Sequence, residues 1–154
     1  MADFSSTFSF ENAIVSQFIF YATIVLLKMM LMSVWTSKNR ISKEVYANEE
    51  DLKLSPDDKL KIKTTDKDVE RIRRCHQNDI ENIIPFVLIG CFYCMTGPSP
   101  FIAGLHFRLF AAIRIFHTIA YRFAIPQPAR FIAFLGGWGI TASMAVVVLG
   151  SATM

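Results

Sequence analysis

The sequence predicts an all-α integral membrane protein, a single domain over residues 1–154 that folds as a bundle of four transmembrane helices. Its 154 residues are 53% hydrophobic, and the mean hydropathy of +0.37 is high for a soluble domain of this length. The apolar residues also fall into long runs, and a helix needs about 20 mostly apolar residues to cross a bilayer core. Helices are expected because backbone polar groups cannot remain unpaired in lipid.

The first predicted span covers residues 10–36, where the formal charges are Glu11 and Lys28. This segment is too long for a cleavable signal peptide and lacks a basic start, so we expect it to be retained. A charged loop at about 38–68 follows. From about Asp66, acidic residues at the start of a helical pattern predict a second helix that begins outside the membrane and enters it without a break.

The remaining spans are predicted at about 75–95, 101–123 and 128–150. Residues 83–107 and 131–154 carry no Asp, Glu, Lys or Arg. The first of these runs is too long for one span, and two prolines and a glycine within residues 96–100 predict a turn that divides it.

Charge is distributed unevenly between the two predicted faces of the membrane. Eleven Lys or Arg residues lie between Lys38 and Arg74, together with nine acids, and Arg122 and Arg130 flank the last link. The opposite face has no Lys or Arg, so the positive-inside rule places residues 38–74 and 122–130 in the cytosol. The near balance of acids argues against nucleic-acid binding. The three cysteines show no disulfide or zinc spacing, and no metal site is predicted.

Charged side chains inside the predicted spans need a physical reason, because each costs roughly 2.5–3.5 kcal/mol in the bilayer centre. An antiparallel pairing of the second and third helices would place Glu81 level with His117. Structural ion pairs are one explanation, and Glu81 with Arg114 is the obvious pair. We favour this explanation for Arg108 and Lys28, or a side chain that snorkels to the interface in the case of Lys28.

For the polar cluster at residues 73–82 we favour a binding site. Helical spacing groups two sets of residues on facing helices: Arg74, Asn78 and Glu81 on the second, and Arg114, His117 and Tyr121 on the third. At equal depth, these faces would line a polar pocket that opens to the cytosol. The arginines at positions 71, 73 and 74 outnumber the local acid, and arginine binds carboxylates bidentately, so the pocket suits an anionic ligand.

Residues 69–86 resemble the signature of the membrane-associated proteins in eicosanoid and glutathione metabolism. The family pattern E-R-x-x-R-x-x-x-N-x-x-E is present as Glu70, Arg71, Arg74, Asn78 and Glu81. The resemblance implies a four-helix protomer, a homotrimer, and glutathione bound between protomers near the cytosolic face. It also implies a multi-pass protein of the endoplasmic reticulum membrane, or of the outer mitochondrial membrane, in contact with membrane lipid.

Within that family the chain is most similar to the glutathione transferases, through residues 21–24, 28–30, 47–48, 106–108, 117–121 and 126–128. This similarity implies conjugation of glutathione, as substrate, to hydrophobic electrophiles from the bilayer, and reduction of lipid hydroperoxides. Leu52 departs from the pattern, since well-known members carry a cysteine there, so activation through that thiol is not implied.

The resemblance also implies which residues bind glutathione. The family's contacts fall on Arg40, Arg73, Arg74, His76, Asn78, Glu81, Tyr121 and Arg130. Glutathione carries two carboxylates and one ammonium group, which suits several arginines and one acid. A nearby cation lowers the pKa of a thiol, so we expect Arg130 to stabilise the thiolate, with Tyr121 as a hydrogen-bonding partner.

Three alternatives stay open. The family's glutathione-dependent prostaglandin E synthases share the signature, but the resemblance to them would call for a serine where this chain has Phe131. The leukotriene C4 synthases are less similar, because His117 replaces the tyrosine expected in their pattern. A non-catalytic membrane scaffold or small channel belongs to another class, and the apolar segments 87–95 and 139–149 argue against a conduction path.

Overall fold

The computed structural model describes residues 8–53, 62, 63 and 65–152. Long helices dominate this part of the chain: α2 (Ala13–Ser42), α4 (Lys67–Met95), α5 (Pro100–Arg122) and α6 (Ala129–Ser151), with the short α3 (Glu49–Leu52) after α2. The prediction of an all-α fold is therefore confirmed for the described residues. The helix α2 continues six residues beyond the predicted limit of 36, and part of the predicted 38–68 loop lies outside the described residues.

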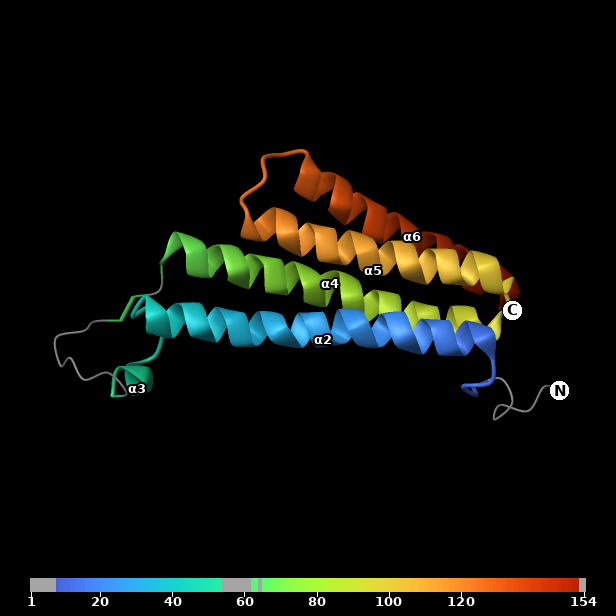
Figure 1. Cartoon of the computed structure of the whole chain (residues 1–154), viewed down its shortest axis with the longest axis horizontal. Coiled ribbons are helices and arrows are strands. Elements are labelled where there is room, and N and C mark those ends of the chain that lie inside the picture. The colour runs from blue at the N-terminus through green and yellow to red at the C-terminus, as the bar shows by residue number, and fades with distance from the viewer. Residues whose placement is uncertain (1–7, 54–61, 64, 153–154) are drawn as a thin grey trace.

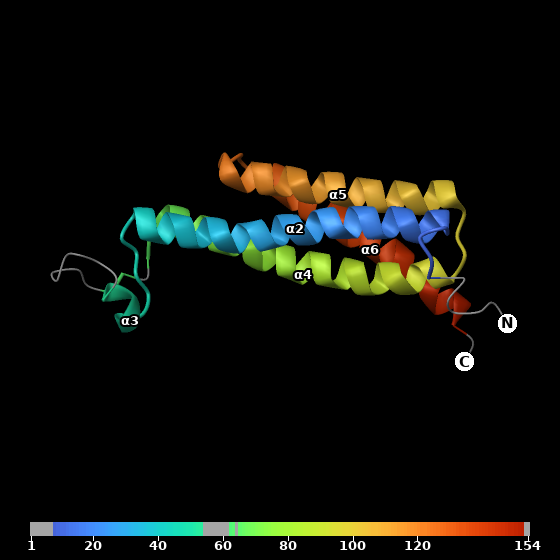
Figure 2. The same ribbon diagram turned by 60° about the horizontal axis from the view of Figure 1, so that its bottom comes forward.

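The long helices run alternately up and down in an elongated bundle (Figures 1 and 2). The pair α4–α5 has α2 packed on one side and α6 on the other. We call the end where α2 stops and α4 starts the loop end, and the end that holds the α4–α5 turn the terminal end. At the loop end, α2 and α4 extend beyond the link between α5 and α6, which leaves a step in the bundle (Figure 1).

The start of α4 is fixed by a capping residue. The Asp66 side chain accepts hydrogen bonds from the backbone N–H groups of Asp68 and Val69, at 3.0 and 3.1 Å. Lys43, just after α2, forms ion pairs with both Asp66 and Asp68. The pKa of the Asp66 carboxyl is lowered, mainly by the hydrogen bond from the Val69 N–H and further by those from Asp68 and Lys43. The predicted helix start near Asp66 is confirmed, and α4 then continues through Pro85 without a break.

The core contains a group of aromatic rings toward the terminal end. Phe86 of α4 stacks on Phe110 of α5, with ring centroids 3.7 Å apart. Phe18 of α2 lies 5.3 Å from Phe107, also measured between centroids. The turn from α4 to α5 contains Gly97, whose φ of +63° favours glycine. These contacts hold three helices together away from the charged end.

Much of the outer surface of the bundle is apolar. Large hydrophobic side chains on every long helix are exposed, including Leu31, Leu88, Phe116 and Val146. Among the described helices, α2, α5 and α6 are long and apolar enough, by length and composition, to cross a membrane. The chain is therefore a multi-pass membrane protein. The helix α4 falls short of this measure because its first half carries most of the charges.

Candidate functional site

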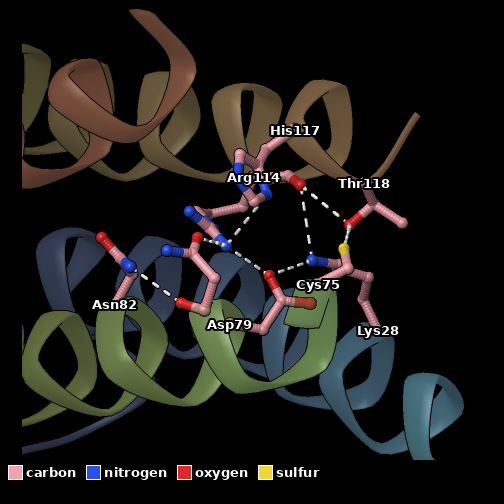
Figure 3. A network of polar contacts seen from close by, with 8 residues as sticks. Lys28, Cys75, Asp79, Asn82, Arg114, His117 and Thr118 are labelled. Atoms are coloured by element: carbon pink, nitrogen blue, oxygen red, sulfur yellow. Dashed lines mark hydrogen bonds and ion pairs between the residues drawn. The ribbon is translucent and has the colours of Figure 1, made fainter. Parts of the chain in front are cut away.

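A buried network of charged groups joins three helices near the middle of the bundle (Figure 3). Asp79 of α4 and Arg114 of α5 are both fully buried. The ammonium Nζ of Lys28, on α2, lies 2.6 Å from Asp79 Oδ1. Arg114 Nη2 forms an ion pair with the same carboxylate oxygen. Lys28 also donates a hydrogen bond to the backbone carbonyl of Arg114, at 3.3 Å.

The same arginine reaches two of the residues singled out from the sequence. Arg114 Nη2 donates to Asn78 Oδ1 at 3.0 Å and lies 3.3 Å from His117 Nδ1. Asn82 in turn donates to the Asn78 backbone carbonyl at 2.7 Å. Asp79 Oδ2 and the Nε and Nη1 groups of Arg114 have no partner among the described residues. Two cations thus share one carboxylate, and the network carries an excess positive charge.

The ion pair between Glu81 and Arg114, considered as the alternative to a binding site, does not form, because Arg114 pairs with Asp79. Glu81 is exposed and accepts a hydrogen bond from Gln77 at 3.2 Å. Residues two apart on a helix point about 200° apart. Glu81 therefore faces away from Asp79, whose carboxylate pairs with Arg114. The predicted pairing of the helices is also wrong here, since it would place Asp79 beside Ile119.

The structural explanation for Lys28 is confirmed, because its ammonium group forms the ion pair with Asp79. Arg108 differs from the expectation of an ion pair. Its Nε donates to the Tyr21 hydroxyl at 3.2 Å, and no acidic group among the described residues pairs with it. A neutral partner on the adjacent helix therefore takes the place of the expected carboxylate.

A second group of predicted residues meets where α5 ends and α6 begins. The Arg130 guanidinium carbon lies 4.9 Å from the centroid of the Tyr121 ring. The His117 ring is 4.9 Å from Tyr121, between centroids. The predicted face of Arg114, His117 and Tyr121 is thus confirmed. Arg130 Nε is buried and has no hydrogen-bond partner among the described residues.

A third group lies at the loop end around Glu70. Arg73 Nε donates to both carboxylate oxygens of Glu70, at 3.1 and 2.9 Å. This hydrogen bond, together with the nearby charges of Arg73, Arg74 and Arg40, lowers the pKa of the Glu70 carboxyl. Arg73 and Arg74 are exposed, while Arg40 and His76 are half-buried. Three of the predicted arginines therefore surround one carboxylate.

The predicted pocket between the second and third helices is only partly right. A cavity of about 240 Å³ does open at the loop end between α2, α4 and α5, and Tyr121 lines it. Its α4 wall is made by Asp68, Arg71, Ile72 and Cys75, however, and not by Arg74, Asn78 and Glu81. Glu81 instead lines a second cavity, of about 330 Å³, between α4 and α6.

Asp79 is the central residue that the sequence reasoning missed. Its spacing could have revealed it, because Ile72, Cys75, Asp79, Asn82 and Phe86 follow one another at three or four residues. That spacing describes the buried stripe of a helix, and all five side chains are buried. Among the described residues, no group of three or more His, Cys, Asp or Glu side chains could hold a metal ion.

Known proteins resemble this chain over nearly its whole length. The family model of the MAPEG family matches residues 18–150. Human microsomal glutathione S-transferase 1 is 48% identical over 143 residues, which cover 92% of each chain; the rat protein of that name is 46% identical over the same share. Horse prostaglandin E synthase is 36% identical over 135 residues, 88% of this chain and 87% of the synthase. As its signature predicted, the chain belongs to the MAPEG family.

Proposed function

We propose that this chain is a membrane-bound glutathione transferase that joins the thiol of glutathione to lipophilic electrophiles. The proposal rests on the difference in sequence identity between this chain and two sets of relatives. Identity is 46–48% to proteins named microsomal glutathione S-transferase 1 and 34–36% to proteins named prostaglandin E synthase.

Arg130 and Tyr121 offer the chemistry that this reaction needs. The glutathione thiol must lose its proton, and a nearby cation favours the thiolate. The Arg130 guanidinium, whose Nε has no partner among the described residues, can donate a hydrogen bond to the thiolate sulfur, and the Tyr121 hydroxyl can donate a second. The thiolate then attacks an electrophilic carbon; with 1-chloro-2,4-dinitrobenzene, a C–S bond forms and chloride leaves. Stabilised charge and close approach supply the catalysis.

The other predicted residues suit the rest of glutathione. Its two carboxylates match the arginines Arg40, Arg73 and Arg74, its ammonium group matches Glu81, and His76 and Asn78 are hydrogen-bonding partners. These groups lie apart on one chain: Glu81 is exposed, while Asn78 is tied to Arg114. A site completed by a neighbouring protomer would bring them together, which supports the homotrimer implied by the resemblance.

Placement in the membrane follows from the same proposal. The helix α4 is the fourth span, in addition to the three recognised by composition, and the basic loop end faces the cytosol. The proposed location is the endoplasmic reticulum membrane or the outer mitochondrial membrane. The electrophile then reaches the thiolate from the bilayer.

The test is an activity assay on the purified chain in phosphatidylcholine nanodiscs. We expect glutathione to react with 1-chloro-2,4-dinitrobenzene, and the absorbance of the conjugate measures the rate. Arg130→Ala should lose at least about a hundredfold in rate, the usual effect of removing one donor to a developing anion. Lys38→Ala is the matched control, since it removes an exposed cation at the same end of the bundle. An unchanged rate in Arg130→Ala would contradict the role of Arg130 in stabilising the thiolate.

Two further substrates in the same panel separate the alternatives. Turnover of prostaglandin H2 without any conjugation would favour the synthase, which the Phe131 position argues against. A lipid hydroperoxide tests the second activity that the thiolate permits. There, one thiolate attacks the peroxide oxygen and releases the alcohol, and a second glutathione gives the disulfide and water.

A further inference from the structure

The cavity of about 240 Å³ at the loop end is distinct from most of the residues implied for glutathione. Its lining residues include Arg122 at the end of α5, and α2 and α4 continue beyond that point as a step in the bundle (Figures 1 and 2). Trp35 of α2, Arg71 of α4 and Arg122 of α5 contribute to its wall, and Cys75 and Thr118 lie deeper in the bundle. Apart from Tyr121, none of the residues implied for glutathione lines it.

Two arginines give this cavity a positive rim. Arg122 lies over the Trp35 ring, with its guanidinium carbon 5.3 Å from the centroid, and no acidic group among the described residues pairs with it. Arg71 Nη1 is 3.6 Å from Asp68 Oδ1, but Asp68 also forms an ion pair with Lys43. Arg71 and Lys43 thus share the carboxylate of Asp68, and the guanidinium groups of Arg71 and Arg122 retain capacity for another anion.

The floor of the cavity adds to the positive charge. Cys75 Sγ lies 3.9 Å from Thr118 Oγ1, and that hydroxyl donates to the Arg114 backbone carbonyl at 3.2 Å. Lys28 donates to the same carbonyl at 3.3 Å. The excess positive charge of Lys28 and Arg114 over Asp79 therefore lies next to Thr118 and Cys75 (Figure 3), which line the cavity. Met32 and Ile72 supply an apolar wall.

The level of the cavity along the bundle matches a membrane surface. Tryptophan is enriched where the hydrocarbon core meets the head groups, and Trp35 is followed by the polar end of α2. Arg122 lies in the last turn of α5, beyond its apolar stretch. Basic pockets between spanning helices at this level bind phosphorylated head groups.

We propose that this cavity binds the phosphate group of an anionic amphiphile, held between Arg71 and Arg122, with the adjoining carbon atoms against Trp35 and Met32. The site goes beyond glutathione transfer and does not depend on it. It also assigns a binding role to Arg71, which is part of the family signature but is not among the residues implied for glutathione. Tyr121 borders both this cavity and the Arg130 side chain, so the two sites are neighbours.

Tryptophan fluorescence can test this directly, because the chain has two tryptophans. Trp138→Phe leaves Trp35 as the only one. In phosphatidylcholine nanodiscs we compare quenching by brominated phosphatidic acid with quenching by brominated phosphatidylcholine at equal mole fraction. We expect stronger quenching by phosphatidic acid. Arg71→Gln and Arg122→Gln should each weaken this selective binding about fivefold, from about 1 kcal/mol for each basic residue near a membrane surface.

Lys38→Gln is the matched control, since Lys38 is an exposed cation at the same end that does not line the cavity; it should keep the selectivity. A second arm adds inorganic phosphate to discs of phosphatidylcholine alone. A saturable change in Trp35 fluorescence that requires Arg122 would assign the same anion site to a soluble phosphate, and no change beside selective lipid quenching would assign it to a lipid head group.

Two results would overturn the proposal. One is equal quenching by both lipids together with no response to phosphate, a result that needs no arginine variant to fold. The other is selective quenching that survives in both Arg71→Gln and Arg122→Gln. Either outcome leaves the conjugation assay, which uses Arg130, unaffected.

Discussion

At the scale of single residues, Asp79 has the largest consequences in this bundle. Its carboxylate is fully buried and forms ion pairs with both Lys28 of α2 and Arg114 of α5. Through Arg114 it also fixes the position of Asn78, a residue proposed to contact glutathione. Removing one partner of a buried ion pair leaves an uncompensated charge, which is far more costly than losing the pair as a whole.

Asp79→Ala should therefore lower the free energy of unfolding by about 3–5 kcal/mol, because two buried cations would face each other without an anion. Lys28→Met is the matched control: it leaves Asp79 and Arg114 as a pair and should cost clearly less. Thermal unfolding in detergent, followed by circular dichroism, measures both. Equal losses in the two variants would show that Asp79 does not balance both cations.

The sequence identified the arginines, Glu81 and Tyr121 as candidates, but not Asp79. A signature marks which residues recur, and it does not tell how a helix is rotated in its bundle. That rotation is set by the packing of α4 against α2 and α5, through side chains such as Phe86 and Phe110. The pairing of Arg114 with Asp79, and not with Glu81, follows from this packing.

At the scale of elements, the contact between α2 and α4 depends on a small residue. A Cβ atom added at Gly90 of α4 would lie 2.5 Å from Cε2 of Phe18 on α2. Phe18 cannot move aside easily, because its ring also packs against Phe86 and Phe107. Overfilling a well-packed interior forces side chains away from their preferred rotamers.

Gly90→Ala should destabilise the bundle by about 1–3 kcal/mol, although alanine is the better helix former. Gly139→Ala in α6 is the matched control, because a Cβ atom there meets nothing within 4 Å; it should be neutral or slightly stabilising. The midpoint of thermal unfolding distinguishes them. A Gly90→Ala variant as stable as its Gly139→Ala counterpart would contradict the close packing of Phe18.

Local signals predicted the ends of elements better than the contacts between them. Asp66 marked the start of α4 because capping depends on a few neighbouring residues. The alignment of α4 with α5 depends on side chains spread along both helices. A simple antiparallel pairing about the turn therefore failed at Asp79, far from that turn.

At the scale of the whole molecule, the exposed face of α4 indicates an incomplete surface. Glu81 is exposed beside Ile80, Ile84 and Leu88, which are 40%, 43% and 57% exposed. A carboxylate facing lipid at this position is costly. Contact with another copy of the chain would cover it, in line with the proposed homotrimer.

Native mass spectrometry of the chain released from nanodiscs should give the mass of three copies. Glu81→Gln removes the charge but keeps the shape, and we expect it to keep the three-chain mass while raising the KM for glutathione. A monomer or dimer as the main species of the parent chain would contradict the trimer.

The family and the helical class followed from sequence patterns, whereas an assembly depends on surfaces that one chain leaves unpaired.

The ion pair of Lys28 and Asp79 has a consequence for how the chain is made. The two residues are 51 positions apart, so at about 5–20 residues per second of synthesis the lysine waits several seconds for its partner. During that interval α2 carries an unbalanced charge in its apolar stretch. Arg114 follows later still, so Lys28 and Asp79 can form a neutral pair before the second cation arrives. We infer that α2 settles fully in the membrane only once α4 has been translated. Ribosome-bound chains that end before Asp79 should therefore retain α2 less firmly in microsomes, as measured by alkaline extraction.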